Sequence, residues 1–127
     1  MRGKKILLID DDEDSNFLNS WIIKRGFAEV IECYQSAQEA LIFLKNNSEK
    51  PDKLPDFIFL DLRMPLMDGF GFIAEFEKLP ETILNKCKIV VLTSSFDKED
   101  YLRVSRNKYV IGFLNKPLTF EALENFK

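Results

Sequence analysis

Short apolar runs alternate with stretches of helical periodicity along this chain of 127 residues. The clearest run is Phe57–Leu60, where apolar residues lead into an aspartate and then into a turn marked by proline and glycine. An unbroken apolar run of this length is typical of a strand buried on both faces of a sheet. Similar runs predict further strands at residues 6–9, 30–34, 88–92 and 110–114.

Helical spacing between these runs predicts five helices. The first ends at Gly26, Ser36 and Glu39 form a capping box for the second, and a third follows Gly69. A polar helix is expected within residues 97–107, and Thr119 caps a short last helix that runs to residue 127. The apolar stripes of the first three helices are Phe17, Leu18, Trp21 and Ile22; Ala37, Ala40, Leu41 and Leu44; and Phe72, Ile73, Phe76 and Leu79.

The alternation of strands and helices predicts an α/β fold, a doubly wound five-stranded parallel sheet with helices on both faces. Residues 1–127 have the length of one domain. The net charge of −3 comes without a basic block, which argues against direct nucleic-acid binding. No apolar run approaches the ~20 residues of a membrane span or forms a signal peptide, so no membrane contact is expected.

Histidine is absent, which excludes His-based general base catalysis, most zinc sites and histidine phosphorylation within this chain. Cys33 and Cys87 are too few and too far apart in sequence for a disulfide framework. We expect both to be buried, reduced packing residues of a cytoplasmic protein.

Polar side chains stand where the predicted strands end. Asp10 and Asp11 follow the first strand, Asp61 follows the third, Thr93 with Ser94 and Ser95 ends the fourth, and Lys116 follows the fifth. Because the carboxyl ends of parallel strands meet at one edge of a sheet, these residues are expected to form a site there.

The residue types at this edge indicate phosphoryl transfer. Crowded carboxylates raise each other's pKa unless a cation neutralises them, and oxygen ligands without histidine or cysteine suit Mg²⁺. Lys116 and Thr93 supply a positive charge and a hydrogen-bond donor for an oxyanion. An aspartate can itself accept the phosphoryl group. Asp12, Glu13 and Asp14 are interpreted as first-turn helix residues rather than ligands, and Asp68 as the residue that fixes the turn before Gly69.

With these residues in place, the chain resembles the receiver domain of two-component response regulators, of the stand-alone type. The resemblance extends from Lys5 to about Phe126. It implies a flavodoxin-like strand order of 2-1-3-4-5. The motifs that carry it are Ile9-Asp10-Asp11, Leu60-Asp61 with Met64-Pro65 and Met67-Asp68-Gly69, Thr93-Ser94, and Phe113 with Lys116-Pro117.

The resemblance also implies a role for each site residue. Asp61 would accept phosphate from a partner phosphohistidine. Mg²⁺ would be bound by Asp11, Asp61 and the backbone carbonyl of Arg63, with Asp10 acting through a water. On phosphorylation, Lys116 would pair with the phosphate, Thr93 and the Ser94 amide would hydrogen-bond it, and Phe113 would move inward with Thr93.

The Lys116-Pro117 bond is expected to be cis, since the chain has little room to turn there and the cis form before proline costs only about 0.5–1 kcal/mol. The receiver family implies the same isomer, which aims the lysine at Asp61.

Two departures from the family stand out. Asn107 occupies the turn before the fifth strand, where glycine is usual and a left-handed conformation is expected, and the last helix is shorter than usual.

Two other classes stay open. In an aspartate-nucleophile phosphatase of the haloacid dehalogenase type, Asp10 and Asp12 would be nucleophile and acid, but a further acidic motif is missing and Asp61 has no role. In a pseudo-receiver, the fold would serve binding alone, although no key residue is lost. We therefore expect a cytoplasmic signalling switch or phosphorelay carrier that promotes only its own phosphorylation and dephosphorylation. Its partners would be a histidine kinase or histidine phosphotransfer protein and an unidentified downstream protein.

Overall fold

The computed structural model describes residues 4–94 and 97–126. Ser95 and Lys127, predicted to belong to a strand exit and to the last helix, lie outside this part of the chain. The strands are β1 (Lys5–Ile9), β2 (Val30–Tyr34), β3 (Phe57–Leu60), β4 (Lys88–Thr93) and β5 (Val110–Asn115). The helices are α1 (Glu13–Gly26), α2 (Ala37–Asn46), the 3₁₀ turn η1 (Pro51–Lys53), α3 (Gly69–Phe76), α4 (Glu81–Lys86), α5 (Lys98–Ser105) and α6 (Phe120–Glu124).

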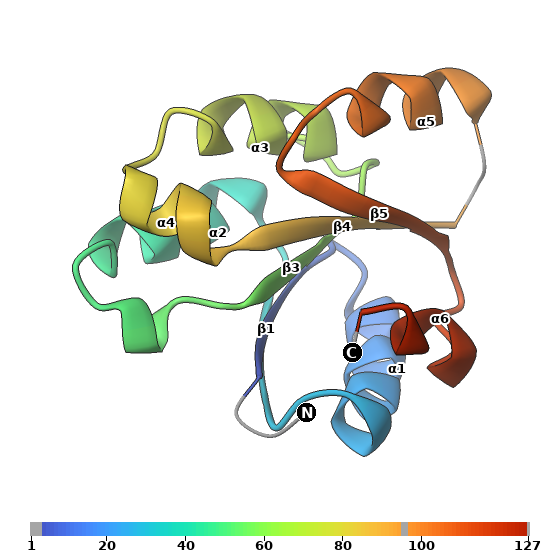
Figure 1. The fold of residues 1–127 in the computed structure, drawn as a ribbon. Coiled ribbons are helices and arrows are strands. Elements are labelled where there is room, and N and C mark those ends of the chain that lie inside the picture. The colour runs from blue at the N-terminus through green and yellow to red at the C-terminus, as the bar shows by residue number, and fades with distance from the viewer. Residues whose placement is uncertain (1–3, 95–96, 127) are drawn as a thin grey trace.

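The strands form one parallel sheet in the order β2-β1-β3-β4-β5, which confirms the doubly wound α/β prediction and its strand order. Figure 1 shows α2, α3, α4 and α5 on one face of the sheet and α1 and α6 on the other. From β1 the chain runs outward to β2 on one side and then returns to β3 on the other. Open α/β sheets place their ligand sites outside the carboxyl ends of the strands at such a point.

The core consists of two layers divided by the sheet, and β3 contributes to both. Ile58 and Leu60 pack with residues of α2, α3, α4 and α5, whereas Phe57 and Phe59 pack with residues of α1 and α6. All four side chains are buried, because successive residues of a strand point to opposite faces and both faces are covered. The prediction that this strand is buried on both sides is confirmed.

Helix α1 forms as predicted, but of its predicted apolar stripe Ile22 alone packs against the core. Phe17, Leu18 and Trp21 are exposed, and the inward face instead carries two asparagines, Asn16 and Asn19, with Ile23. The periodicity misleads here because polar residues take buried positions. The Asn16 side chain donates a hydrogen bond of 2.8 Å to the backbone carbonyl of Asp10, and this bond partly offsets its burial.

The segment between β3 and β4 holds two helices where one was expected. The predicted inward residues Phe72, Ile73, Phe76 and Leu79 are buried, but α3 ends at Phe76 and α4 starts after Pro80. Proline has no amide hydrogen for the helical ladder, so a single continuous helix is interrupted there.

Two smaller expectations are wrong. Cys33 is exposed on the edge strand β2, although Cys87 is buried as predicted. Among the described residues, Leu66 is the non-glycine residue with positive φ, so Asn107 does not adopt the left-handed conformation. The Asn107 side chain instead stabilises the turn before β5 by accepting a hydrogen bond from the Tyr109 amide at 2.9 Å.

None of the helices in residues 4–94 and 97–126 has both the length and the apolar character of a membrane span.

Candidate functional site

Three carboxylates meet at the carboxyl ends of β1 and β3. Ile9 and Leu60 are paired in the sheet, so Asp10 and Asp61, the residues that follow them, lie on adjacent strands at the same edge. Carboxylate oxygens of Asp10, Asp11 and Asp61 lie within 4.8 Å of one another. Asp10 and Asp61 are buried and Asp11 is exposed. The predicted clustering of these residues is present in the fold.

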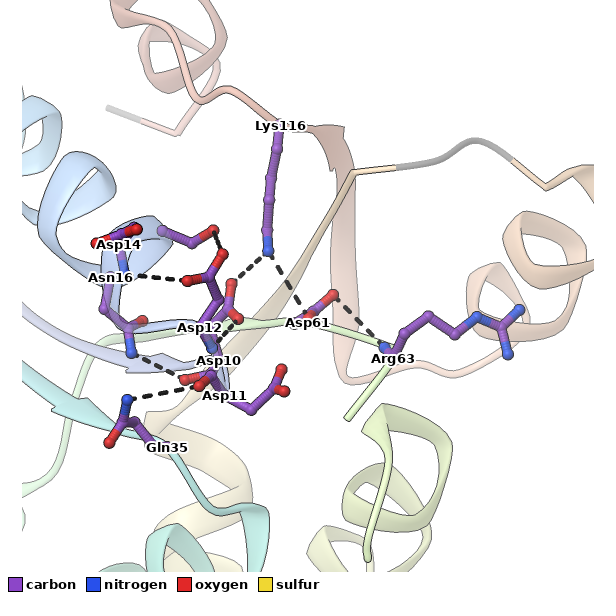
Figure 2. Close-up of polar contacts among 10 residues, drawn as sticks. Asp10, Asp11, Asp12, Asp14, Asn16, Gln35, Asp61, Arg63 and Lys116 are labelled. Atoms are coloured by element: carbon purple, nitrogen blue, oxygen red, sulfur yellow. Dashed lines mark hydrogen bonds and ion pairs between the residues drawn. The ribbon is translucent and has the colours of Figure 1, made fainter. Parts of the chain in front are cut away.

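Lys116 reaches this cluster from the loop after β5. Its ammonium forms an ion pair with Asp10 and lies 3.7 Å from Oδ2 of Asp61 (Figure 2). The Lys116-Pro117 bond is cis, as expected from the sequence. The Lys116 amide donates to the Thr93 carbonyl at 2.7 Å, which continues the pairing of β5 with β4 up to the lysine. The Lys116 ammonium therefore lies between the two buried carboxylates.

The pKa of Asp61 is raised from 3.8 to about 6. Burial is the largest cause, because it penalises the charged form. The Lys116 charge lowers the pKa, the Asp10 charge raises it, a hydrogen bond from the Arg63 amide lowers it, and the Asp11 charge raises it. The predicted crowding of carboxylates thus contributes, but the burial of Asp61 contributes more.

The loop between β1 and α1 is fixed by hydrogen bonds to Asp10 on both its side chain and its backbone. Oδ1 of Asp10 accepts the Asp12 amide at 2.9 Å, and its carbonyl accepts the Asn16 side chain. The Asp11 carbonyl accepts a longer bond of 3.4 Å from Gln35. Sequence reasoning missed Asn16 and Gln35, because no spacing rule indicates which polar side chain will bond a given backbone carbonyl.

The other acidic residues of this stretch belong to helix ends, as interpreted from the sequence. Asp12 caps α1 by accepting the Asp14 amide and the Ser15 hydroxyl, and Glu13 and Asp14 occupy the first turn. Asp68 caps α3 by accepting the Gly71 amide at 2.9 Å. None of these four joins the oxygen cluster of Asp10, Asp11 and Asp61 within the described residues.

Gly69 lies close to the backbone of the loop that follows β3. A Cβ atom at this position would lie 2.7 Å from the Asp61 carbonyl oxygen and 2.8 Å from the Cα of Leu62. Backbone atoms cannot move aside as a flexible side chain can, so α3 approaches the loop only because residue 69 is glycine. The turn at Met67-Asp68-Gly69 therefore packs directly against the backbone of Asp61 and Leu62.

The remaining predicted site residues lie on β4 and β5. Thr93 is buried at the end of β4, and Ser94 follows it and is exposed. Phe113 is half-buried on β5 and its ring meets that of Tyr101 on α5 edge to face, with centroids 5.4 Å apart. Their roles in binding and switching stay predictions.

The acidic cluster fits a hard divalent cation. Its donor atoms are all carboxylate oxygens, and neither histidine nor cysteine contributes. The raised pKa of Asp61 shows that Lys116 alone does not offset the negative charge and the burial of the site. A cation placed among these oxygens would supply that missing charge.

Comparisons with known proteins give a consistent result. The family model described as "Response regulator receiver domain" matches residues 6–126. The "Probable methanogenesis regulatory protein FilR2" of Methanothrix harundinacea is 32% identical over 120 residues, which cover 94% of this chain and 76% of that protein. The "Hybrid signal transduction histidine kinase D" of Dictyostelium discoideum is also 32% identical, but the match covers 97% of this chain and only 8% of that protein.

A solved structure of a two-component response regulator from Cytophaga hutchinsonii superposes with a TM-score of 0.87 at 33% identity. The superposition covers 96% of this chain and 92% of that one. The fold of the described residues and the order of their strands are therefore those of this group of proteins.

Proposed function

The chain belongs to the response regulator receiver domain family, and we propose that it is a phosphoacceptor switch of two-component signalling, with Asp61 as the acceptor. The observation that carries the proposal is the position of Asp61. Its carboxylate is buried at the end of β3, within ion-pair distance of Lys116 and within 4.8 Å of two further carboxylates. A carboxylate that only caps a turn does not require burial next to a lysine and two other carboxylates.

In the proposed step, an ionised oxygen of Asp61 attacks the phosphorus of a partner's phosphohistidine. The O–P bond forms as the N–P bond breaks, and the electron pair returns to the imidazole nitrogen of the partner. Because the pKa of Asp61 is about 6, the carboxylate is mostly ionised at neutral pH and can act as the nucleophile. At lower pH the carboxylate becomes protonated and can no longer act as the nucleophile.

The other site residues stabilise the transferred group. Lys116 already lies between Asp10 and Asp61, and its ammonium would pair with the oxygens of a phosphoryl group on Asp61. The Thr93 hydroxyl and the Ser94 amide would donate hydrogen bonds to the remaining oxygens. Phe113 would follow the displacement of Thr93, which makes it the proposed aromatic reporter of phosphorylation.

Receiver domains bind Mg²⁺ at an acidic pocket, and the residues for such a pocket are present here. We assign Asp11, Asp61 and the backbone carbonyl of Arg63 as direct ligands, and Asp10 as a ligand through water. Bound Mg²⁺ would offset the carboxylate charge and polarise the phosphoryl oxygens. Asp11 is the exposed member of the cluster, so it offers the route by which the ion enters.

Receiver domains take phosphate from histidine kinases or histidine phosphotransfer proteins, and we propose such a phosphodonor as the upstream partner. Its docking surface would include Phe17, Leu18 and Trp21, exposed apolar residues of the helix that begins just after the acidic cluster. Leu18→Ala should slow transfer from the phosphodonor and leave labelling by acetyl phosphate unchanged. Equal slowing of both reactions would contradict this use of α1.

Downstream, the proposal gives the domain no reaction beyond its own phosphorylation and dephosphorylation. Output would come from contact with another protein or from onward phosphate transfer, in the cytoplasm. A haloacid dehalogenase-type phosphatase is disfavoured because Asp12, its required acid, is exposed and caps α1. A pseudo-receiver would bind partners without labelling, so one experiment separates it from the proposal.

That experiment is phosphorylation by acetyl phosphate with Mg²⁺, followed by intact-mass measurement. The wild-type protein should gain one phosphoryl group that is lost on treatment with hydroxylamine, as an acyl phosphate is. Asp61→Asn should gain none, while Asp12→Asn should be labelled like the wild type. An unlabelled wild type would support the pseudo-receiver, and normal labelling of Asp61→Asn would refute the acceptor assignment.

A further inference from the structure

Arg63 connects α5 to the loop that begins at Asp61, which we name the acceptor loop. Its amide lies 3.5 Å from Oδ1 of Asp61, whereas its guanidinium forms an ion pair with Asp100 in the first turn of α5. Figure 2 shows its side chain extending away from Asp61 and Lys116. The same residue therefore contacts the acceptor through its backbone and α5 through its side chain.

An aromatic ring extends this connection to α3. The Arg103 guanidinium lies 3.9 Å from the ring centroid of Phe70, and that of Arg63 lies 5.8 Å from it. Both cations face the electron-rich side of one ring, an attractive arrangement. Arg63, Phe70, Asp100 and Arg103 thus form one cluster that joins the acceptor loop, α3 and α5, and we name it the α5 clasp.

Helix α5 is weakly attached apart from such contacts. It buries only Val104 among its residues, and an open pocket of about 170 Å³ lies between it and α3. At its other end, Asn107 donates to Glu77 on the α3 side at 2.8 Å. Tyr101 adds the edge-to-face contact with Phe113 on β5. With one buried residue and this ring contact, α5 still has little hydrophobic stabilisation, so its position also depends on polar contacts such as those of the clasp.

The two partners of the ion pair differ in exposure. The Arg63 side chain is 57% exposed and that of Asp100 only 15%. The guanidinium can leave the pair and remain hydrated, but the covered carboxylate can regain water only if its surroundings open. Separation of the pair is therefore expected to loosen the first turn of α5 rather than the acceptor loop.

We propose that the α5 clasp couples the charge at the acceptor site to the packing of α5, with Asp100 as a positioning residue that holds Arg63 on α5. The coupling rests on the proposed function, because a phosphoryl group on Asp61, with a charge of about −2, supplies the competing attraction for the guanidinium. A phosphoryl group on Asp61 then favours a state in which α5 packs less tightly. By thermodynamic reciprocity, looser packing of α5 favours a phosphoryl group, or its mimic, on Asp61.

The first arm of the test measures the affinity of the full chain for beryllofluoride, a phosphoryl mimic, by calorimetry with Mg²⁺. Asp100→Asn frees Arg63 and should tighten binding by about two- to five-fold, the range expected from a partly exposed ion pair. In a protein that already carries Arg63→Ala, Asp100→Asn should leave the affinity for beryllofluoride unchanged. Asp100→Glu should restore wild-type affinity, because it keeps the pairing charge.

Glu99→Gln is the matched control. It removes one negative charge from the same helical turn, at the exposed position next to Asp100, and should leave the affinity unchanged. A pair that merely stabilised the fold would lower Tm on Asp100→Asn without changing the affinity. That outcome would overturn the coupling, and so would tightening of equal size in the Arg63→Ala background.

The second arm needs no phosphoryl mimic and measures hydrogen exchange of residues 98–105 in the ligand-free protein. Asp100→Asn and Arg63→Ala should each speed exchange, and the double variant should exchange no faster than either. Unchanged exchange in both single variants would overturn the clasp. If the wild type failed to bind beryllofluoride, the proposed function and the coupling would fall, while this arm would still decide whether the clasp holds α5.

Discussion

Replacing Asp61 with asparagine should stabilise the protein in the absence of Mg²⁺, even though it removes the proposed acceptor. The folded protein holds the Asp61 proton more tightly than the unfolded chain does, because burial raises the pKa from 3.8 to about 6. The free energy of unfolding therefore falls as pH rises from about 4 to about 6 and stays lower above that range. Asparagine carries no charge, so the free energy of unfolding of the variant does not fall in this way.

The size of the effect follows from the shift in pKa. A difference of about 2 units corresponds to about 3 kcal/mol at most, at ~1.36 kcal/mol per unit. Asp61 is 7% exposed but stands at an edge of the sheet that is open to water, so screening reduces this value. We expect Asp61→Asn to gain about 1–2 kcal/mol at a pH of about 7.5, and almost nothing near pH ~4, where the wild-type carboxyl is protonated.

The assay is urea unfolding followed by circular dichroism, with a chelator present, at a series of pH values. Both proteins should show the same denaturant slope, so that the difference lies in the midpoint. Asp12→Asn is the control, because hydrogen bonds from Ser15 and Asp14 lower the Asp12 pKa, and this variant should gain no stability at neutral pH. Addition of Mg²⁺ should stabilise the wild type more than Asp61→Asn.

Two results would refute the reasoning. A variant that is less stable than the wild type at neutral pH without Mg²⁺ would mean that the ionised carboxylate is well solvated or fully paired with Lys116. A gain that stayed constant down to a pH of about 4 would mean that the effect comes from packing rather than from ionisation.

Three further substitutions test other parts of the site. Asp11→Ala should weaken Mg²⁺ binding measured by calorimetry and raise the metal-free Tm slightly, by less than Asp61→Asn, because Asp11 is exposed; a clear drop in the metal-free Tm would contradict the crowding. Lys116→Met should raise the pKa of Asp61 above its wild-type value of about 6, since the lysine charge lowers it; an NMR titration that shows an unchanged or lower pKa would count against the observed ion pairing. Gly69→Ala should cost about 1–3 kcal/mol in urea unfolding because its Cβ would meet the backbone of Asp61 and Leu62; a neutral result would show that the loop can shift.

The strands and the site edge could be predicted from the sequence because both depend on local rules. A run such as Phe57–Leu60 has no polar residue to expose, so a doubly covered strand is its favourable environment. Once the sheet is parallel, residues that follow its strands must share one edge, which brings Asp10 and Asp61 together whatever the loops do. The predicted caps at Ser36 and Thr119 also follow from local hydrogen bonding.

The tertiary structure decided what local rules leave open. The sheet contacts the face of α1 that carries Asn16 and Asn19, because Asn16 can bond the Asp10 carbonyl and Ile23 fills the core. The pKa of Asp61 depends mainly on burial, which arises only in the folded chain. The pairing of Arg63 with Asp100 joins residues 37 positions apart, and no spacing rule links them. Such contacts are set by the packing of whole helices, which is why only the folded chain defines them.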